Sequence, residues 1–398
     1  MLGTLYRNCC CAHGRDDDIF DILAAVNIYV HFPFCRSKCA YCALRSRAGV
    51  PESERAAYAK RVVDELLRVA PSRARARAGA RTSYTVYFGG GTPALCDLLP
   101  VCEAVRAALG DVEEFTVELN PRDVTSALLA ELRAGGVSRI SMGVQSLDDG
   151  ALRAMGRPHT AAEAEAAFLA IREAGFANAG FDLIAGWPGT TAGAWGQTLQ
   201  RACALKPDHV SVYTLIREPG TALDRAVREG GLTLPDDDAA LAQHDAARAA
   251  LESIGLVRYE VSNFAKPGFE CRHNVSVWRG EDYVGIGEGA HGRDGLRRTV
   301  GNACGGYDVT ELTPEADALE RALFALRTVR GLDLDETMKR WPILAPLRAA
   351  WRAELLSLVP HGIAREVATD RFALTDRGFE VCDAVISAIM SAGQETEA

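Results

Sequence analysis

No stretch of the sequence approaches the roughly 18 uninterrupted apolar residues that a membrane-spanning helix requires. The N-terminus also lacks the basic-then-apolar order of a secretory signal, because Asp16, Asp17 and Asp18 precede the first apolar run. Basic residues are in the minority, with 44 Lys and Arg against 53 Asp and Glu, which gives a formal net charge of −9. A phosphate-binding surface needs a basic face, so this balance argues against nucleic acid as the main partner. We therefore expect a cytoplasmic protein that is not an integral membrane protein.

The 398 residues are enough for one large domain of roughly 250–300 residues and a smaller one. From about residue 26, short β-branched and aromatic runs alternate with helical stretches rich in Ala, Leu, Glu and Arg. Strands are predicted at residues 27–32, 84–88, 115–119, 139–144, 179–184 and 209–215, and helices at about 52–70, 96–109, 125–134, 160–174, 194–204 and 236–254. This alternation predicts an α/β fold of βαβ units with a parallel sheet. Six units are two short of a closed eight-stranded barrel, which leaves a three-quarter barrel or an open doubly wound sheet.

The chain divides into four parts by pattern. Residues 1–25 are predicted to be a disordered extension, and residues 26–256 form the βα domain. Residues 257–313 are predicted to be a connecting functional loop region, because their Gly, Asn, aromatic and His residues are typical of a site more than of a packing element.

Residues 314–398 are predicted to form a C-terminal helical domain that resembles a winged helix. Three helical segments precede a hairpin at 363–367 and 371–374, and a last helix follows at 378–390, with Thr375 or Asp376 as its cap. Ten Lys and Arg against fourteen Asp and Glu in this part disfavour a DNA-binding wing. We therefore interpret it as a lid or docking module.

Three of the twelve cysteines are closely spaced directly after the first predicted strand, in the order Cys35-x₃-Cys39-x₂-Cys42. Thiols grouped in this way in a cytosolic chain point to a metal or to catalysis. Three thiolates on one short loop suit a [4Fe-4S] cluster that leaves one iron without a protein ligand. A structural zinc site is the alternative, but it requires a fourth ligand, and His31 is the only candidate nearby.

This loop after strand one, followed by βα units, resembles the radical S-adenosylmethionine superfamily. The resemblance implies that the open iron is chelated by the amino and carboxylate groups of S-adenosylmethionine. It also implies that an electron passing through the cluster cleaves the sulfonium and releases a 5′-deoxyadenosyl radical. In that superfamily the fold is a partial barrel, so of the two architectures we predict the three-quarter βα barrel of six units.

Two further signals agree with this resemblance. The glycine turn from Phe88 to Pro93 lets backbone approach a ligand closely, although such turns also end many strands without any ligand. Polar residues occur at the carboxyl ends of three consecutive strands, as Glu118, Gln145 and Asp182. Each could be a strand-end cap by itself, but in barrel folds this end carries the active site, so together they are interpreted as ligands of a nucleoside.

The resemblance narrows to the oxygen-independent coproporphyrinogen III oxidases and the heme chaperones related to them. It rests on the motif from Tyr29 to Cys35, the GGGTP turn, ELNP, SMGVQS, the Gly156-Arg157 pair, YEVSNFA, GIGEGAHG and the LTDRG hairpin, and it covers about residues 27–398. Carried over by motif, the residues in contact with S-adenosylmethionine are Tyr29, Gly90, Thr92, Glu118, Gln145, Arg157, Asp182 and Ile216, with the Tyr41 ring near the adenine.

Two positions distinguish the oxidases from the chaperones. The oxidases continue the cluster loop to a further cysteine, where this chain has Leu44. The chaperones carry a His-Asn-x-x-Tyr-Trp motif associated with heme, and this chain has His273, Asn274 and Trp278 with Val277 in place of the tyrosine. His273 could alternatively satisfy loop backbone, and His291 is a competing iron ligand.

The resemblance therefore predicts a heme chaperone that binds heme through His273 and Trp278 and delivers it to an acceptor protein. It implies a flavodoxin- or ferredoxin-type electron donor, and any association with a membrane would pass through the acceptor. The alternative is an oxidase that decarboxylates two propionates of coproporphyrinogen III.

Overall fold

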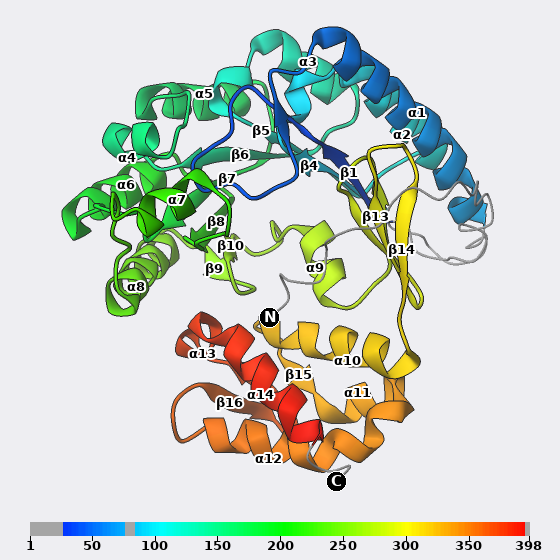
Figure 1. The fold of residues 1–398 in the computed structure, drawn as a ribbon, viewed down its shortest axis with the longest axis vertical. Coiled ribbons are helices and arrows are strands. Elements are labelled where there is room, and N and C mark those ends of the chain that lie inside the picture. Colours follow the sequence, from blue (N-terminus) through cyan, green and yellow to red (C-terminus); the bar gives the residue numbers. More distant parts are fainter. Residues whose placement is uncertain (1–26, 76–83, 395–398) are drawn as a thin grey trace.

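The computed structural model describes residues 27–75 and 84–394, so the predicted extension at 1–25 lies outside the described residues. A curved sheet with helices on its outer face stands above a smaller, mostly helical domain (Figure 1). Within these ranges, no helix has the length and apolar character needed to cross a bilayer.

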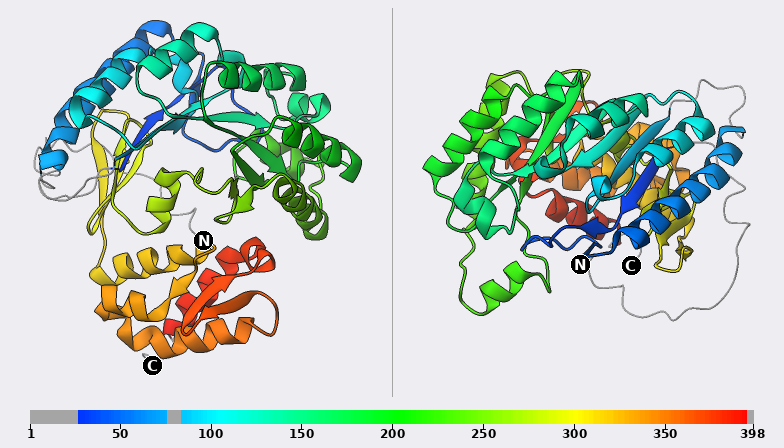
Figure 2. Two further views of the ribbon diagram at one scale, coloured as in Figure 1. Left: turned by 180° about the vertical axis from the view of Figure 1, so that it is seen from behind. Right: turned by 90° about the horizontal axis from the view of Figure 1, so that it is seen from above.

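Six parallel strands lie side by side in sequence order: β1 (Asn27–Phe32), β4 (Thr85–Gly90), β5 (Glu114–Leu119), β6 (Arg139–Gln145), β7 (Asn178–Ala185) and β8 (His209–Thr214). All six predicted strands are present, each within two residues of its predicted ends. Because right-handed crossovers between strands in sequence order all turn the same way, the connecting helices gather on one face. Figure 2 shows this from behind and from above.

The covering helices are α1 (Glu52–Arg75), α2 (Leu99–Leu109), α3 (Ser126–Ala134), α4 (Asp149–Ala154), α5 (Ala161–Glu173), α6 (Ala192–Ala204) and α8 (Asp237–Ser253). Helix α7 (Ala222–Arg228) instead packs on the cysteine loop, where Leu223 N–H donates to Ala40 O at 2.8 Å. Helices α4 and α7 were not predicted, because six or seven residues are too few for a clear helical periodicity. Thr160 and Glu163 form a reciprocal capping box at the start of α5, which fixes where that helix begins.

Alternate residues of each strand face the helices or the interior. On β1, Ile28, Val30 and Phe32 belong to the apolar core under the helices. The residues between them are polar or amphipathic, and Thr85 on β4 donates a hydrogen bond to Asn27, its neighbour on β1. This period of two is repeated on all six strands, so the barrel has an apolar outer layer and a polar lining. The lining supplies the side chains of the site.

The segment 257–313 corrects a prediction, because it is a sheet extension and not a connecting loop region. It contains β9 (Val257–Arg258), β10 (Asn263–Ala265), α9 (Arg272–Trp278), β11 (Tyr283–Ile286), β12 (His291–Asp294), β13 (Arg297–Gly301) and β14 (Tyr307–Glu311). Strand β10 pairs antiparallel with β8, and β11 pairs parallel with β1. Among the described strands, the sheet ends at β14 on one side and at β9 on the other without pairing of these two edges, so the barrel is partial, as predicted. The prediction failed locally because strands of two to five residues leave little periodicity.

The C-terminal part has its own core around Trp351, Leu355 and Phe372. Its elements are α10 (Pro314–Phe324), β15 (Leu332–Asp333), α11 (Leu334–Arg340), α12 (Arg348–Leu358), β16 (Ala364–Ala368), β17 (Arg371–Leu374), α13 (Asp376–Glu380) and α14 (Cys382–Gln394). The predicted hairpin is present as β16 and β17, and β15 adds a third strand. Thr375 caps α13, and the predicted last helix is divided at Val381.

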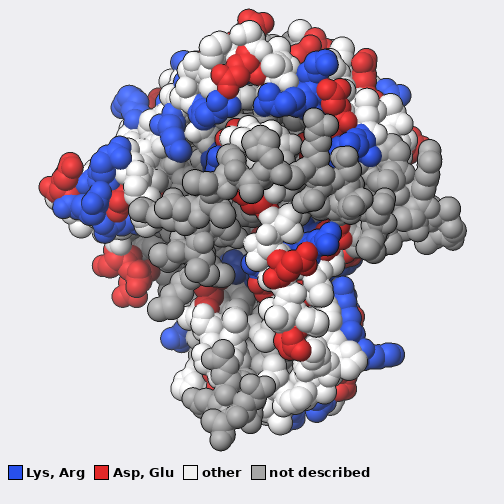
Figure 3. Space-filling model, turned by 45° about the vertical axis from the view of Figure 1, so that its right-hand side comes forward, with Lys and Arg blue, Asp and Glu red and all other residues white. Residues whose placement is uncertain are grey.

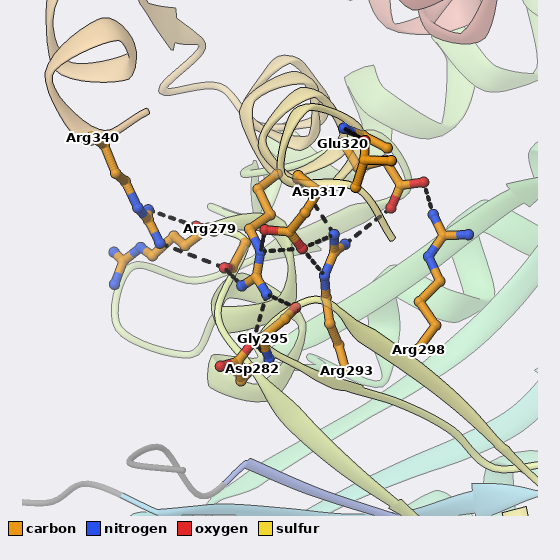
Figure 4. A network of polar contacts seen from close by, with 12 residues as sticks. Arg279, Asp282, Arg293, Gly295, Arg298, Asp317, Glu320 and Arg340 are labelled. Atoms are coloured by element: carbon orange, nitrogen blue, oxygen red, sulfur yellow. Dashed lines mark hydrogen bonds and ion pairs between the residues drawn. The ribbon is translucent and has the colours of Figure 1, made fainter. Parts of the chain in front are cut away.

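A buried ionic network joins the sheet extension to this C-terminal part (Figure 4). Arg293 on β12 donates to Asp317 on α10 at 3.1 and 2.5 Å, and Arg321 donates to the same carboxylate at 2.9 and 3.0 Å. Arg321 also reaches Asp282 at 2.7 Å, and Arg293 reaches Glu320 at 3.1 Å. Removing one partner from such a group leaves buried charge uncompensated, so the network fixes how the two parts meet.

Charges on the surface are mixed. On the face drawn in Figure 3, basic and acidic side chains are interspersed among uncharged ones. This mixture agrees with the net charge of −9, which is small for a sequence with 44 basic and 53 acidic residues.

Candidate functional site

The cysteine loop follows β1 through the short strand β2 (Phe34–Cys35), which pairs with β3 (Arg47–Ala48). All three thiols are free and partly exposed. Two bonds anchor the loop: Ala40 N–H donates to Met155 O at 2.9 Å, and His31 Nε2 lies 2.9 Å from Arg45 O. The loop is therefore held at both of its sides while its sulfur atoms face a cavity.

The glycine turn lies directly against this loop. A Cβ on Gly91 would lie 2.4 Å from Phe34 O and 3.0 Å from Cys35 Sγ, and Gly90 has a φ of +105°. A side chain at Gly91 would force the turn and the loop apart, and one at Gly90 would collide with the His31 ring, whose nearest atom would be 2.6 Å away. Gly91 was not singled out from the sequence, although the three-glycine motif contains it.

Eleven predicted site residues line one cavity of about 530 Å³ at the carboxyl end of the strands, namely Cys35, Cys39, Cys42, Tyr41, Gly90, Thr92, Glu118, Gln145, Arg157, Asp182 and Ile216. Strand ends that are far apart in the sequence meet here because parallel strands share this edge of the sheet. The cavity is thus a ready site for one medium-sized ligand next to the three thiols.

Three thiols on one loop suit a [4Fe-4S] cluster. Within the described residues, no three His, Cys, Asp or Glu side chains converge as a mononuclear ion requires. A cluster has no such requirement, because each thiolate binds a different iron. The open side of the loop faces the cavity, where a ligand could reach an iron that lacks a protein ligand.

Arg157 connects the cluster loop to the strand ends. Its Nη1 lies 3.3 Å from Cys39 Sγ, and its Nη2 donates to Asn120 Oδ1 at 2.5 Å and to Gly143 O at 2.6 Å. Asn120 in turn donates to Thr92 Oγ1 at 2.9 Å. Asn120 therefore joins the loop, β5 and the glycine turn, a role that its place in the ELNP motif did not reveal.

The cavity lining carries two half-buried carboxyl groups, Glu118 and Asp182. Tyr87 Oη donates to Glu118 at 2.8 Å and Gly90 N–H donates to it at 3.1 Å. Burial, with a further contribution from Asp182, raises the pKa of Glu118 to about 7, and burial also raises the pKa of Asp182. Two neighbouring acids that resist ionisation favour a cationic ligand, because a positive charge stabilises their charged forms.

Gln145 is placed by an irregular backbone. Its φ is +70°, which is uncommon for a residue other than glycine, and the pairing of β6 with β7 is irregular between Gly143 and Gln145. A bulge of this kind redirects a side chain, and such strain concentrates at functional sites.

At the cavity, the Tyr41 ring contacts Trp187 edge-on, with the two ring centroids 6.2 Å apart. Trp187 was not predicted.

Three predicted residues lie outside this cavity: Tyr29, His273 and Trp278. Tyr29 is in the barrel lining, with its Oη 3.0 Å from His31 Nδ1. His273 is 5% exposed and its Nδ1 lies 3.0 Å from Thr85 Oγ1. Trp278, at the other end of α9, packs against Phe324 and does not share a cavity with His273.

Helix α9 is fixed by a carboxylate that the sequence did not reveal. Glu114 on β5 accepts from Arg272 N–H at 3.0 Å, from His273 N–H at 3.1 Å and from Cys271 Sγ at 3.5 Å. Burial raises the pKa of Cys271 to about 12, so this thiol stays protonated. The first N–H groups of a helix have no partner within the helix, and here Glu114 accepts hydrogen bonds from two of them. The N-terminal end of α9, with His273, can therefore be buried.

Comparison with known proteins gives the family. Residues 29–202 match the model of the radical SAM superfamily. The heme chaperone HemW of Mycobacterium tuberculosis is 34% identical over 385 residues, which cover 91% of this chain and 94% of that protein. The chain belongs to the HemW family.

Other relatives match shorter parts of this chain. HemW of Bacillus subtilis is 35% identical over 280 residues, with 68% of this chain and 72% of that protein covered. The mitochondrial radical S-adenosyl methionine domain-containing protein 1 of Bos taurus is 36% identical over 323 residues, with 78% and 70% covered.

The fold is confirmed by a solved structure, that of the Escherichia coli coproporphyrinogen III oxidase HemN. It superimposes with a TM-score of 0.76 over 92% of this chain and 90% of that one, at 22% identity. The partial barrel and the C-terminal part of this HemW family member therefore follow the same architecture.

Proposed function

We propose that this protein is a heme chaperone that holds a [4Fe-4S] cluster and S-adenosylmethionine and passes heme to an acceptor protein. The observation that carries the proposal is the 34% identity to a heme chaperone along 91% of the chain, C-terminal part included. Leu44 agrees with this proposal. It lines the cavity and is 55% exposed, at the position where the oxidases have a further cysteine. The protein would work in the cytoplasm with a flavodoxin- or ferredoxin-type electron donor.

In this proposal Cys35, Cys39 and Cys42 hold the cluster. When bound, the cluster supplies one electron to S-adenosylmethionine. The nucleoside is held by the strand-end and glycine-turn residues of the cavity, and Arg157 keeps the loop in register with β5 through Asn120. Tyr29 supports the site from below, because its Oη contacts His31, which anchors the loop at Arg45 O.

The oxidase is the second candidate, since the fold matches that of HemN and eleven of the predicted site residues line one cavity. Parallel assays separate the two. Cluster-loaded protein should bind heme near one per chain and should convert little or no coproporphyrinogen III in the presence of reductant and S-adenosylmethionine. Robust multiple-turnover decarboxylation would establish the oxidase and refute the chaperone.

We expect the affinity for S-adenosylmethionine to fall about tenfold between pH 8 and pH 6, because Glu118 with a pKa of about 7 becomes protonated over this range. Only the ionised carboxylate attracts a cationic ligand, so binding strengthens as the pH rises. Equilibrium binding to cluster-loaded protein measures the effect. Glu118→Gln should bind weakly at pH 8 and lose the pH dependence; a parent protein with equal affinity at both pH values contradicts the assignment.

A further inference from the structure

Arg157 places a positive charge directly against the cysteine loop. Its Nη1 donates to Cys39 Sγ at 3.3 Å, and its Nη2 donates to Asn120 Oδ1 and Gly143 O. Its Nε is buried and has no hydrogen-bond partner. Among the described residues, this guanidinium group contacts no Asp or Glu side chain. Its charge therefore faces a thiol without a carboxylate to neutralise it.

The position of Arg157 is fixed from several sides. The turn after α4 is closed by Arg157 N–H, which donates to Leu152 O at 2.9 Å, and Met155 O in the same turn accepts from Ala40 N–H of the loop at 2.9 Å. A Cβ at Gly143 would lie 3.3 Å from Arg157 Nη2, so this glycine leaves room for the guanidinium group. The donor is therefore held in place beside the thiol in advance, and little reorganisation is needed for it to act there.

Two other basic side chains near the thiols are neutralised or screened. Arg36 pairs with Asp123 at 2.7 Å, and the Arg36 side chain is 57% exposed. Lys38 is exposed, and its Nζ donates to Leu44 O at 3.3 Å. Water and salt weaken the field of such exposed charges, whereas Arg157 is half-buried in the cavity lining. Arg157 is therefore the cation with the most influence on a charge at the thiols.

The carboxyl groups of the cavity offset little of this charge. Burial raises the pKa of Asp182, and Arg157 is one of several groups that oppose the rise. Burial, with a contribution from Asp182, raises the pKa of Glu118 to about 7, so this group is only about half ionised at neutral pH. Among the described residues, neither carboxyl group forms an ion pair with Arg157.

A fixed donor and a positive charge at a cluster thiolate favour the reduced form of a cluster. Reduction moves one electron from an external donor, which is thereby oxidised, and makes the cluster more negative by one charge. Hydrogen bonds to the ligand sulfur and nearby cations stabilise this added charge and so raise the reduction potential. The effect is larger in a partly buried site than in water, because charges interact more strongly where the medium is less polar.

We infer that Arg157 raises the reduction potential of the cluster, through its hydrogen bond to the Cys39 sulfur and the uncompensated charge that it holds there. The inference rests on the cluster of the proposed function. It gives Arg157 a role beyond keeping the loop in register with β5, because a higher potential allows a weaker one-electron donor to reduce the protein.

The test is a mediated redox titration of cluster-loaded protein without S-adenosylmethionine, followed by paramagnetic resonance. The proteins are the parent, Arg157→Gln, Arg157→Lys, Asn120→Ala and, as the matched control, Arg36→Gln. The control removes the same charge near the same thiols, but from a side chain that is exposed and paired. Asn120→Ala removes the link between Arg157 and β5 while the guanidinium group stays charged. Iron analysis and thermal unfolding confirm that each protein holds its cluster and is folded.

Arg157→Gln should make reduction about tenfold less favourable, which corresponds to a potential about 59 mV lower for a one-electron couple. Arg157→Lys keeps the charge but loses the fixed donor, so it should shift the same equilibrium by about threefold. Asn120→Ala and Arg36→Gln should each shift it by less than about twofold.

An Arg157→Gln variant with the potential of the parent would overturn the inference and leave the proposed function standing. An equal fall in Asn120→Ala would overturn it too, because the effect would then come from the position of the loop and not from the charge. If Arg157→Gln holds no cluster, Arg157→Lys decides, and a potential at or above that of the parent overturns the inference. A parent without a [4Fe-4S] cluster would refute the proposed function itself.

Discussion

Replacing Cys35, Cys39 or Cys42 by alanine is expected to abolish the iron centre. The parent protein, reconstituted without oxygen, should bind about four irons per chain, with a broad absorbance band and a paramagnetic signal upon reduction. In a [4Fe-4S] cluster each thiolate would hold its own iron, and the three thiols line one cavity. Iron and sulfide analysis with paramagnetic resonance, repeated with S-adenosylmethionine added, measures the loss.

Cys96→Ala and Cys203→Ala are the controls for the cysteine replacements. Cys96 is 7% exposed, and burial raises the pKa of its thiol to about 12, so it stays protonated and unable to bind a metal. Cys203 donates to Ala250 O at 3.5 Å on the helical side of the sheet. Both variants should keep the full signal. Stoichiometric zinc without iron in the parent would contradict the cluster.

Asp317→Ala is expected to lower the free energy of unfolding by about 3 kcal/mol or more, because it breaks a buried ion pair from one side. Asp317 accepts from Arg293 and Arg321, whose side chains are only 5% and 8% exposed. Glu320 and Asp282 still contact these arginines, which places the loss near the lower end of the range for buried pairs. Urea unfolding of parent and variant, followed by circular dichroism, measures the difference.

The matched control is Asp383→Ala, which removes the Arg327–Asp383 pair. Asp383 is 85% exposed, so the expected loss is about 0–1 kcal/mol. Similar losses in both variants would mean that the network at Asp317 is no more important for stability than a surface pair.

Local spacing predicted the parts of the site that are continuous in the chain. The six strands were found because each buries an apolar run that ends at a turn, and the cysteine loop was found because its three ligands lie within eight residues. Glu118, Gln145 and Asp182 could be grouped because parallel strands bring their carboxyl ends to one edge.

The other parts of the site depend on contacts between residues that are far apart in the sequence. Asn27 and Glu281 are 254 positions apart and lie within hydrogen-bonding distance because β11 pairs with β1. That pairing carries α9 under the sheet, which is why His273 is enclosed by Thr85 and capped through Glu114, and why it does not share a cavity with Trp278.

The sequence by itself thus determined the βα repeat, the cysteine loop, the glycine turn and the HemW-type motifs. These depend on periodicity and spacing along a few consecutive residues. The tertiary structure alone decided which side of α9 each motif residue faces, how Arg157 and Asn120 connect three segments, and that Trp278 and Trp341 line one cavity between the barrel and the C-terminal part. Such contacts join residues whose separation along the chain leaves no local pattern, so they are fixed only when the sheet extension and the C-terminal part pack against the barrel.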